Sequence, residues 1–261
     1  MKSPKPKKGV EPKKSSTPKK EDQKGVIKKG DELPGLRTRS ATTQLYKAVA
    51  TLSKNQRESV REMGLGRMLK FRMDGVPSKI AYFVVDKFKP ESMEIDLGNI
   101  KLLIDSEKIE TLFGLKNEGD ILEVTSKKKL GTVAKAWKSR YGKSYITRAE
   151  VVSKMREDAD NPGIFFKIDF IALFSSVMAE SGNNEYMKLD FVPSIKDETN
   201  LNNINWNKYV MDALKRCKDT WMSSGGGPRF TGPLALLTLV YVDSMACPVI
   251  NVERSMSPLK F

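Results

Sequence analysis

Apolar residues recur at helical spacing along most of the chain beyond residue 40. In TQLYKAVATL, 43–52, Leu45, Val49 and Leu52 fall on one face, which predicts an amphipathic helix. The range 164–182 is the most apolar part of the chain, so we expect a helix there at the centre of the domain. The same spacing predicts further helices over 53–63, 78–88, 106–113, 127–140, 147–158, 204–221 and 233–245.

Local signals predict where several of these helices begin and end. The sequences SKNQ, 53–56, and TRAE, 147–150, have the pattern of a capping box, in which the first and fourth residues satisfy each other's backbone N–H groups. Asp105 is placed to cap the helix over 106–113. Gly64 and Gly114 are placed to end the two helices before them in left-handed turns.

The pattern changes to alternation over 93–105, MEIDLGNIKLLID. Apolar and acidic residues alternate from Met93 to Leu97, and Gly98-Asn99 suits a two-residue turn, so we expect a small β-hairpin near 93–104. No internal repeat is present. The predicted fold is mainly α, with a single multi-helix domain over 33–261 that carries this hairpin.

A basic tail precedes the predicted domain. Residues 1–32 are rich in Lys, Pro, Ser and Gly and hold too few apolar residues to offset the entropy of ordering, so we expect them to be disordered. The first 40 residues carry eleven Lys and two Arg against five acidic residues, which is most of the net charge of +14. The remainder of the chain is only mildly basic.

The tail has three readings: a nuclear-import signal, an arm that contacts DNA or RNA without sequence choice, or a solvated tail. Its SPKP and TPKK stretches resemble the repeats of linker-histone tails, and phosphate on Ser3 or Thr17 would weaken binding to nucleic acid. The candidate residues for import or phosphate contact are Lys7, Lys8, Lys13, Lys14, Lys19 and Lys20.

A second basic segment lies within the domain, over 125–148, with eight Lys or Arg residues and no acidic residue. Lysines interleaved with aromatic residues suit phosphate contact combined with base stacking. The alternative is that Trp137, Tyr141 and Tyr145 pack in the core while the cations form a solvated face. The candidate nucleic-acid patch comprises Lys127, Lys128, Lys129, Lys135, Trp137, Lys138, Arg140 and Lys143.

Composition excludes several chemistries. The chain has no His, which excludes Ser-His-Asp and Cys-His nucleophilic sites and His-containing zinc sites, and Cys217 and Cys247 cannot form a four-Cys site. No signal peptide is recognisable, so we expect an intracellular protein with both thiols reduced. The longest apolar run, 233–242, is about half the ~20 residues of a membrane span, so we expect no membrane partner.

The remaining motifs match catalytic patterns poorly. YGKS, 141–144, lacks the Gly that a phosphate-binding loop needs five positions before Gly142, and GLG, 64–66, lacks a third Gly in phase. SSGGGPRF, 223–230, suits a flexible connection better than an anion cradle. An acidic metal site would need carboxylates such as Asp158, Asp160, Asp169 and Asp243, but no spacing selects three of them. For Asp169, in an apolar helix, we expect a structural ion pair.

Eight stretches carry a resemblance to a family of proteins. They are RTRSATTQL, LSKNQRESVREMGLGRML, VPSKIAYFVVDKF, IDLGNIKLLIDSEKIETLFGL, ITRAEVVSKM, FKIDFIALFSSVMAESGN, INWNKYVMDAL and FTGPLALLTLVYVDSM. In this order they resemble uncharacterised plant proteins derived from transposons, in some of which the helical region precedes a SUMO-protease-like domain. The segment is distantly similar to the aminotransferase-like plant mobile domain. The resemblance implies a plant nuclear context and mobile-element ancestry, and no activity.

Together these features predict a non-enzymatic nuclear interaction protein of mobile-element origin. Its expected partners are nuclear proteins, with DNA or RNA as candidates bound independently of sequence, and no cofactor is expected. The alternative is a fragment or degenerate copy of a protease-linked transposon protein that lacks the catalytic domain. A hydrolase or nuclease that uses carboxylates is a third, less favoured class.

Overall fold

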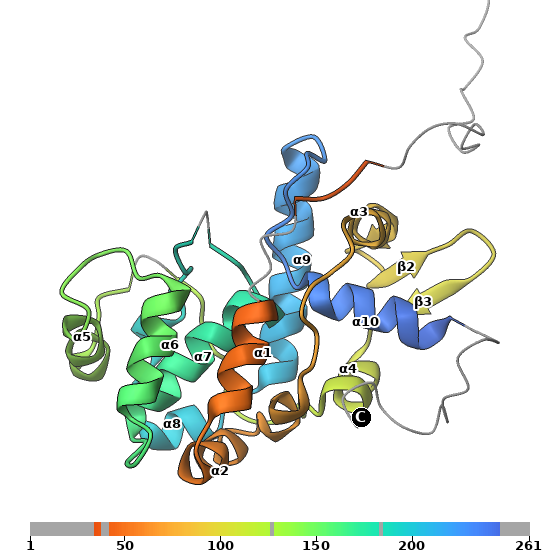
Figure 1. Cartoon of the computed structure of the whole chain (residues 1–261). Helices are drawn as coiled ribbons and strands as arrows, with labels where there is room; N and C mark the ends of the chain where they lie inside the picture. Colours follow the sequence, from red (N-terminus) through yellow and green to blue (C-terminus); the bar gives the residue numbers. More distant parts are fainter. Residues whose placement is uncertain (1–33, 38–41, 126–127, 183–184, 246–261) are drawn as a thin grey trace, which may run out of the picture. The chain divides into compact units, whose positions relative to one another are not determined.

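The computed structural model describes residues 34–37, 42–125, 128–182 and 185–245 (Figure 1). The predicted tail, with Lys7, Lys8, Lys13, Lys14, Lys19, Lys20, Ser3 and Thr17, lies outside the described residues. The described helices are α1 (Thr42–Thr51), α2 (Lys54–Glu62), α3 (Ser78–Lys87), α4 (Ser106–Phe113), α5 (Thr132–Ser139), α6 (Arg148–Glu157), α7 (Ile164–Met178), α8 (Glu198–Asn202), α9 (Trp206–Ser223) and α10 (Leu234–Ser244). The predicted mainly helical fold is confirmed.

The helix ends predicted from local signals are confirmed, but the helix predicted over 127–140 spans only Thr132–Ser139, after Gly131. Both capping boxes form, at Ser53 with Gln56 before α2 and at Thr147 with Glu150 before α6. The Asp105 side chain accepts a hydrogen bond from the backbone of Lys108 at the start of α4. Gly64 and Gly114, with φ of 74° and 66°, end their helices in the left-handed conformation, which costs Gly the least.

Helix α7 is the centre of the core. Every residue from Phe166 to Met178 is buried, and α7 packs against α1, α2, α6 and α10 (Figure 1). Because the whole circumference of the helix is covered, its sequence is apolar all round and has no polar face. The structure ends the helix at Met178, four residues before the predicted end.

Two charged residues of α7 are buried in this apolar setting, Lys167 and Asp169. The Nζ atom of Lys167 lies 2.8 Å from a carboxylate oxygen of Glu62 and 2.7 Å from one of Glu198, and it donates to Asn202 over 3.1 Å. These contacts tie α2 and α8 to α7. Asp169 bonds instead to α5 and the turn that follows it.

The β element is larger than predicted. Strands β2 (Glu94–Asp96) and β3 (Lys101–Leu103) form the expected antiparallel hairpin, closed by a bond from Leu97 N–H to the Ile100 carbonyl oxygen. A third strand, β1 (Phe88–Lys89), pairs with β2, and its first residue was predicted as the end of a helix. Phe88 continues the apolar spacing of α3, so no local signal separates strand from helix. Two short 3₁₀ helices, η1 (Gly66–Lys70) and η2 (Val192–Ser194), complete the described elements.

Candidate nucleic-acid interface

The basic segment folds as the short helix α5 followed by a turn and an extended loop that leads into α6. Gly131 precedes the helix, and Gly142, with a φ of 62°, turns the chain after it. Within this segment, Trp137, Arg140 and Tyr141 are spaced by three and four residues and so lie on one face. Helix α5 therefore has an anchoring face and an opposite, outward face.

The anchoring face is joined to the buried carboxylate of Asp169 in α7. Oδ1 of Asp169 accepts hydrogen bonds from the indole N–H of Trp137 over 2.6 Å and from the hydroxyl of Tyr141 over 2.5 Å. Oδ2 accepts a third from Nη1 of Arg140 over 3.1 Å. The predicted structural ion pair of Asp169 is confirmed, and the contact is a network of three donors on one acid.

Arg140 extends the network to a second carboxylate. Its Nη2 donates to Oδ2 of Asp158 over 2.7 Å, just beyond the end of α6, and its guanidinium lies over the ring of Phe165, 5.2 Å from the centroid. One side chain therefore joins α5 to residues that flank α6 and begin α7. The side chain of Arg140 is only 16% exposed, so little of its charge faces solvent.

Burial dominates the electrostatics of this network. Desolvation raises the pKa of Asp169 from its ordinary value of 3.8 to about 6, although the bonds from Tyr141 and Trp137 and the charge of Arg140 oppose the shift. Burial and the adjacent carboxylate of Asp169 raise the pKa of Tyr141, so its hydroxyl stays a donor. Burial opposes the charge of Arg140, but Asp169 and Asp158 outweigh it and raise the pKa of Arg140.

The structure thus separates the predicted patch into two groups. Trp137 is wholly buried and belongs to the core, because its indole N–H satisfies Asp169, and it is not placed to stack on a base. Arg140 is held by two carboxylates for the same structural purpose. Lys127 lies outside the described residues. The other members face outward or lie partly exposed: Lys128, Lys129, Lys135, Lys138 and Lys143.

These five lysines differ in whether a carboxylate neutralises them. Lys128 pairs with Glu123, and Lys143 pairs with Glu150. Among the described residues, no ion pair is recorded for the other three, which are Lys129, Lys135 and Lys138. We call these three residues the lysine face. They present positive charge that no acidic side chain of the described structure offsets.

Two exposed tyrosines lie at the far end of the basic segment. Tyr145 is 69% exposed and Tyr186, from the loop after α7, is 44% exposed, and their ring centroids are 5.3 Å apart. Sequence reasoning included Tyr145 as an interleaved aromatic residue but missed Tyr186. No signal near Tyr186 could have placed it here, because the pairing joins segments about 40 residues apart.

The acidic residues do not assemble a metal site. Asp158 and Asp169 are bridged by Arg140, and Asp243 pairs with Lys108 over 2.8 Å. Asp160 lies exposed after α6. Within the part of the chain that the structure describes, no group of three or more Cys, Asp and Glu side chains is placed to hold a metal ion.

The glycine motifs have structural roles. Gly142, in YGKS, turns the chain after α5, and Gly64, in GLG, ends α2 as predicted. Gly225 and Gly226, with φ of 80° and 66°, lie in the connection between α9 and α10. In each case a left-handed turn accounts for the glycine.

Two buried side chains on α9 resemble reactive groups but act in packing. Burial raises the pKa of the Cys217 thiol to about 12, which disfavours the thiolate, and Cys247 lies outside the described residues. Burial lowers the pKa of Lys218 to about 8. Its Nζ donates to the carbonyl oxygens of Val85 and Asp86 at the end of α3 and lies 4.3 Å from the ring centroid of Trp221. Lys218 therefore caps α3.

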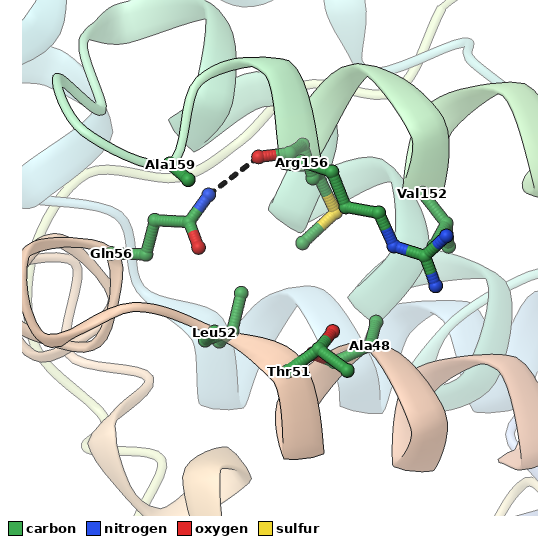
Figure 2. A pocket seen from close by; sticks show the side chains of 8 residues that line it. Ala48, Thr51, Leu52, Gln56, Val152, Arg156 and Ala159 are labelled. Carbon is green, nitrogen blue, oxygen red and sulfur yellow. Dashed lines mark hydrogen bonds between the residues drawn. The ribbon is translucent and has the colours of Figure 1, made fainter.

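Two hollows are formed by described residues. One, of about 70 Å³, lies where α1 and α2 face α6, and Figure 2 shows the Gln56 amide donating across it to the Met155 carbonyl oxygen. It has room for about two water molecules. The other, of about 300 Å³, is polar and lies beside Asp120, Glu123, Lys128 and Asn200. Its mixed charges select no ligand class.

Comparisons with known proteins identify a family and no activity. The family described as a domain of unknown function (DUF8566) matches residues 38–238, which is most of the chain. No curated protein and no solved structure matches the chain. Among the described helices, none is long and apolar enough to cross a bilayer.

Proposed function

Since the chain belongs to the family of the domain of unknown function DUF8566, we propose its function from its own residues: it is a non-enzymatic nuclear protein that contacts nucleic-acid backbones. The contact is made by the lysine face, of which Lys135 and Lys138 lie on α5 and Lys129 precedes it, together with the basic tail. Binding of this kind depends on phosphate charge and does not select a sequence.

The observation that supports this proposal is that some side chains of the basic segment bind the core while others face solvent. Asp169 holds Trp137, Arg140 and Tyr141 inward, so Lys135 and Lys138 are turned away from the core on a fixed helix. A helix that presents lysines without acidic neighbours attracts phosphates and releases their counterions. The two lysines at its flanks, Lys128 and Lys143, are each paired with one glutamate and add less.

The nuclear part of the proposal rests on the sequence. Lys7, Lys8, Lys13, Lys14, Lys19 and Lys20 form clusters of the kind that serve as import signals. The resemblance to transposon-derived plant proteins favours the same compartment and a mobile-element origin. In this proposal the tail delivers the domain to the nucleus and adds a second cationic contact.

The proposed class is a binding protein because the groups that resemble catalytic residues have structural partners. Asp169 is saturated by three donors, Lys218 caps a helix, and the Cys217 thiol is held protonated by burial. The pKa of each of these groups is shifted by its packing in the fold.

The test is the salt dependence of duplex DNA binding by the full chain. Replacing Lys129, Lys135 and Lys138 together by Gln removes up to three phosphate contacts, so the slope of log affinity against log salt falls by up to about 2.7. Fluorescence anisotropy at several salt concentrations measures the slope. The matched control replaces the exposed Lys47, Lys70 and Lys89 by Gln, which lowers the net charge equally.

The proposal fails if both triple variants lose affinity equally, because general charge then explains the binding. It also fails if wild-type affinity does not change with salt. The import signal is tested separately with a fluorescent reporter fused to residues 1–32, which is expected in the nucleus; a reporter that stays in the cytoplasm refutes that role.

A further inference from the structure

Tyr145 and Tyr186 form an exposed aromatic pair, which phosphate binding by the lysine face does not require. Large aromatic side chains are usually buried, yet these rings are 69% and 44% exposed and lie against each other, tilted by 44°. The two neighbouring aromatics of the basic segment, Trp137 and Tyr141, pack edge to face at 5.2 Å on the anchoring side. The segment therefore divides its aromatic residues between the core and the surface.

The exposed pair is held in place by backbone bonds. Thr147 and Tyr186 form an antiparallel bridge, and Met187 N–H donates to the Ile146 carbonyl oxygen over 2.9 Å. Ile146, between Tyr145 and the bridge, is 1% exposed and anchors the loop in the core. The bridge and this bond hold together the two segments that carry the tyrosines, so little conformational entropy remains to be lost when a ligand binds.

The lysines nearest to the pair in the sequence occur in ion pairs. Lys143 lies two residues before Tyr145 and pairs with Glu150. Lys188 lies two residues after Tyr186 and pairs with Glu180 and Asp190. Two lysines against three carboxylates leave no excess positive charge beside the tyrosines, so phosphate contact depends on Lys129, Lys135 and Lys138, earlier in the same segment.

We infer that Tyr145 and Tyr186 form a stacking platform for unpaired bases, so that the protein prefers single-stranded nucleic acid to duplex. This inference rests on the proposed function, because the lysine face holds the phosphate backbone while the tyrosines contact the bases. Aromatic platforms beside cationic grooves are how proteins bind single strands without sequence choice. A duplex hides its base faces in the stack, so only unpaired nucleotides use the platform.

The test compares three labelled probes of equal length on the full chain: oligothymidylate, oligouridylate and a DNA duplex. Tyr145→Ala and Tyr186→Ala are each expected to weaken single-strand binding by at least about fivefold and to leave duplex binding unchanged. Tyr145→Phe and Tyr186→Phe keep the ring and are expected to retain wild-type affinity. Ile100→Ala, on the exposed turn between β2 and β3, is the control for loss of exposed apolar area.

The outcomes separate this inference from the proposed function. If the Tyr→Ala variants bind single strands as well as the wild type while the lysine variants weaken all probes, the platform is refuted and the lysine face stands. If the lysine variants bind all probes as well as the wild type, the proposed function is refuted, and the inference that rests on it is refuted too. Equal loss of single-strand and duplex binding in the Tyr→Ala variants refutes the preference. Tighter binding of oligouridylate than oligothymidylate assigns RNA as the ligand, and the reverse assigns DNA.

Discussion

The indole N–H of Trp137 donates to Oδ1 of Asp169 over 2.6 Å, and this bond joins the basic helix α5 to the most buried helix of the chain, α7. Tyr141 and Arg140 complete the set of donors on the same carboxylate. A buried acid costs free energy unless its oxygens are fully bonded, so the three donors and the acid depend on one another. The position of the lysine face follows from this network.

Asp169→Asn is expected to lower the free energy of unfolding by about 2 kcal/mol at neutral pH, because an amide has one acceptor oxygen and leaves at least one of the three donors without its acceptor. Urea denaturation followed by tryptophan fluorescence measures the change. Asp160→Asn, at an exposed carboxylate, is the matched control and is expected to change stability by less than about 0.5 kcal/mol. Equal effects of the two variants would show that the network contributes nothing.

The stability that Asp169 contributes depends on pH. Its folded pKa of about 6 lies above the ordinary value of 3.8, so the folded state binds the proton more tightly and is favoured at low pH. This contribution is fully present below pH 3.8 and is lost as the pH rises through 6. The stability of the wild type relative to Asp169→Asn is therefore expected to fall by up to about 3 kcal/mol between pH 4 and pH 7. A rise over that range contradicts the shift.

Two glycines with positive φ make a matched pair for substitution. At Gly119, with a φ of 103°, an added Cβ would lie 2.3 Å from the Asn203 carbonyl oxygen, whereas at Gly142, with a φ of 62°, it would meet nothing within 4 Å. Gly142→Ala is expected to cost about 1 kcal/mol from the backbone alone. Gly119→Ala is expected to cost about 3 kcal/mol or more, because the backbone must move. Thermal unfolding of both variants tests the order, and a reversed order rejects the explanation.

Ser53 has two roles, which predicts a larger effect than a helix cap alone. Its side chain accepts from Gln56 N–H at the start of α2 and donates to the Ala159 carbonyl oxygen over 2.7 Å. Ser53→Ala is expected to cost about 2 kcal/mol, measured by chemical denaturation. Ser139→Ala, which removes only an exposed bond to the Ala136 carbonyl oxygen, is expected to be nearly neutral. A cost for Ser53→Ala no larger than that for Ser139→Ala would contradict both roles.

The helix ends could be read from the sequence because their causes are local. The capping box at Ser53 and Gln56 and the left-handed turn at Gly114 each depend on residues within one turn of the helix. Strand β1 could not be predicted in the same way. Its pairing of Phe88 with Ile95 depends on how the hairpin folds back on α3, and the apolar spacing of Phe88 fits either structure.

The sequence predicted which segment forms the candidate interface, but not which of its side chains face inward. The sequence identified the basic segment and an acid, Asp169, that needed partners, but composition cannot say which aromatic residue turns inward. The spacing of Trp137, Arg140 and Tyr141 on one face was the available signal that these residues satisfy a buried acid. The pairing of Tyr145 with Tyr186 joins distant segments and had no such signal.

The direct passage from α3 into β1 couples the register of the sheet to the rotation of a helix. Phe88 follows the last residue of α3, begins the strand and is fully buried, while Lys89 is exposed. A slip of one residue would bring Lys89 into the core and Phe88 into solvent, and it would also turn α3 by about 100° against α10. The three-stranded sheet therefore has one permitted register, although each strand is short. The packing of α3 against α10 fixes that register, because β1 follows α3 directly.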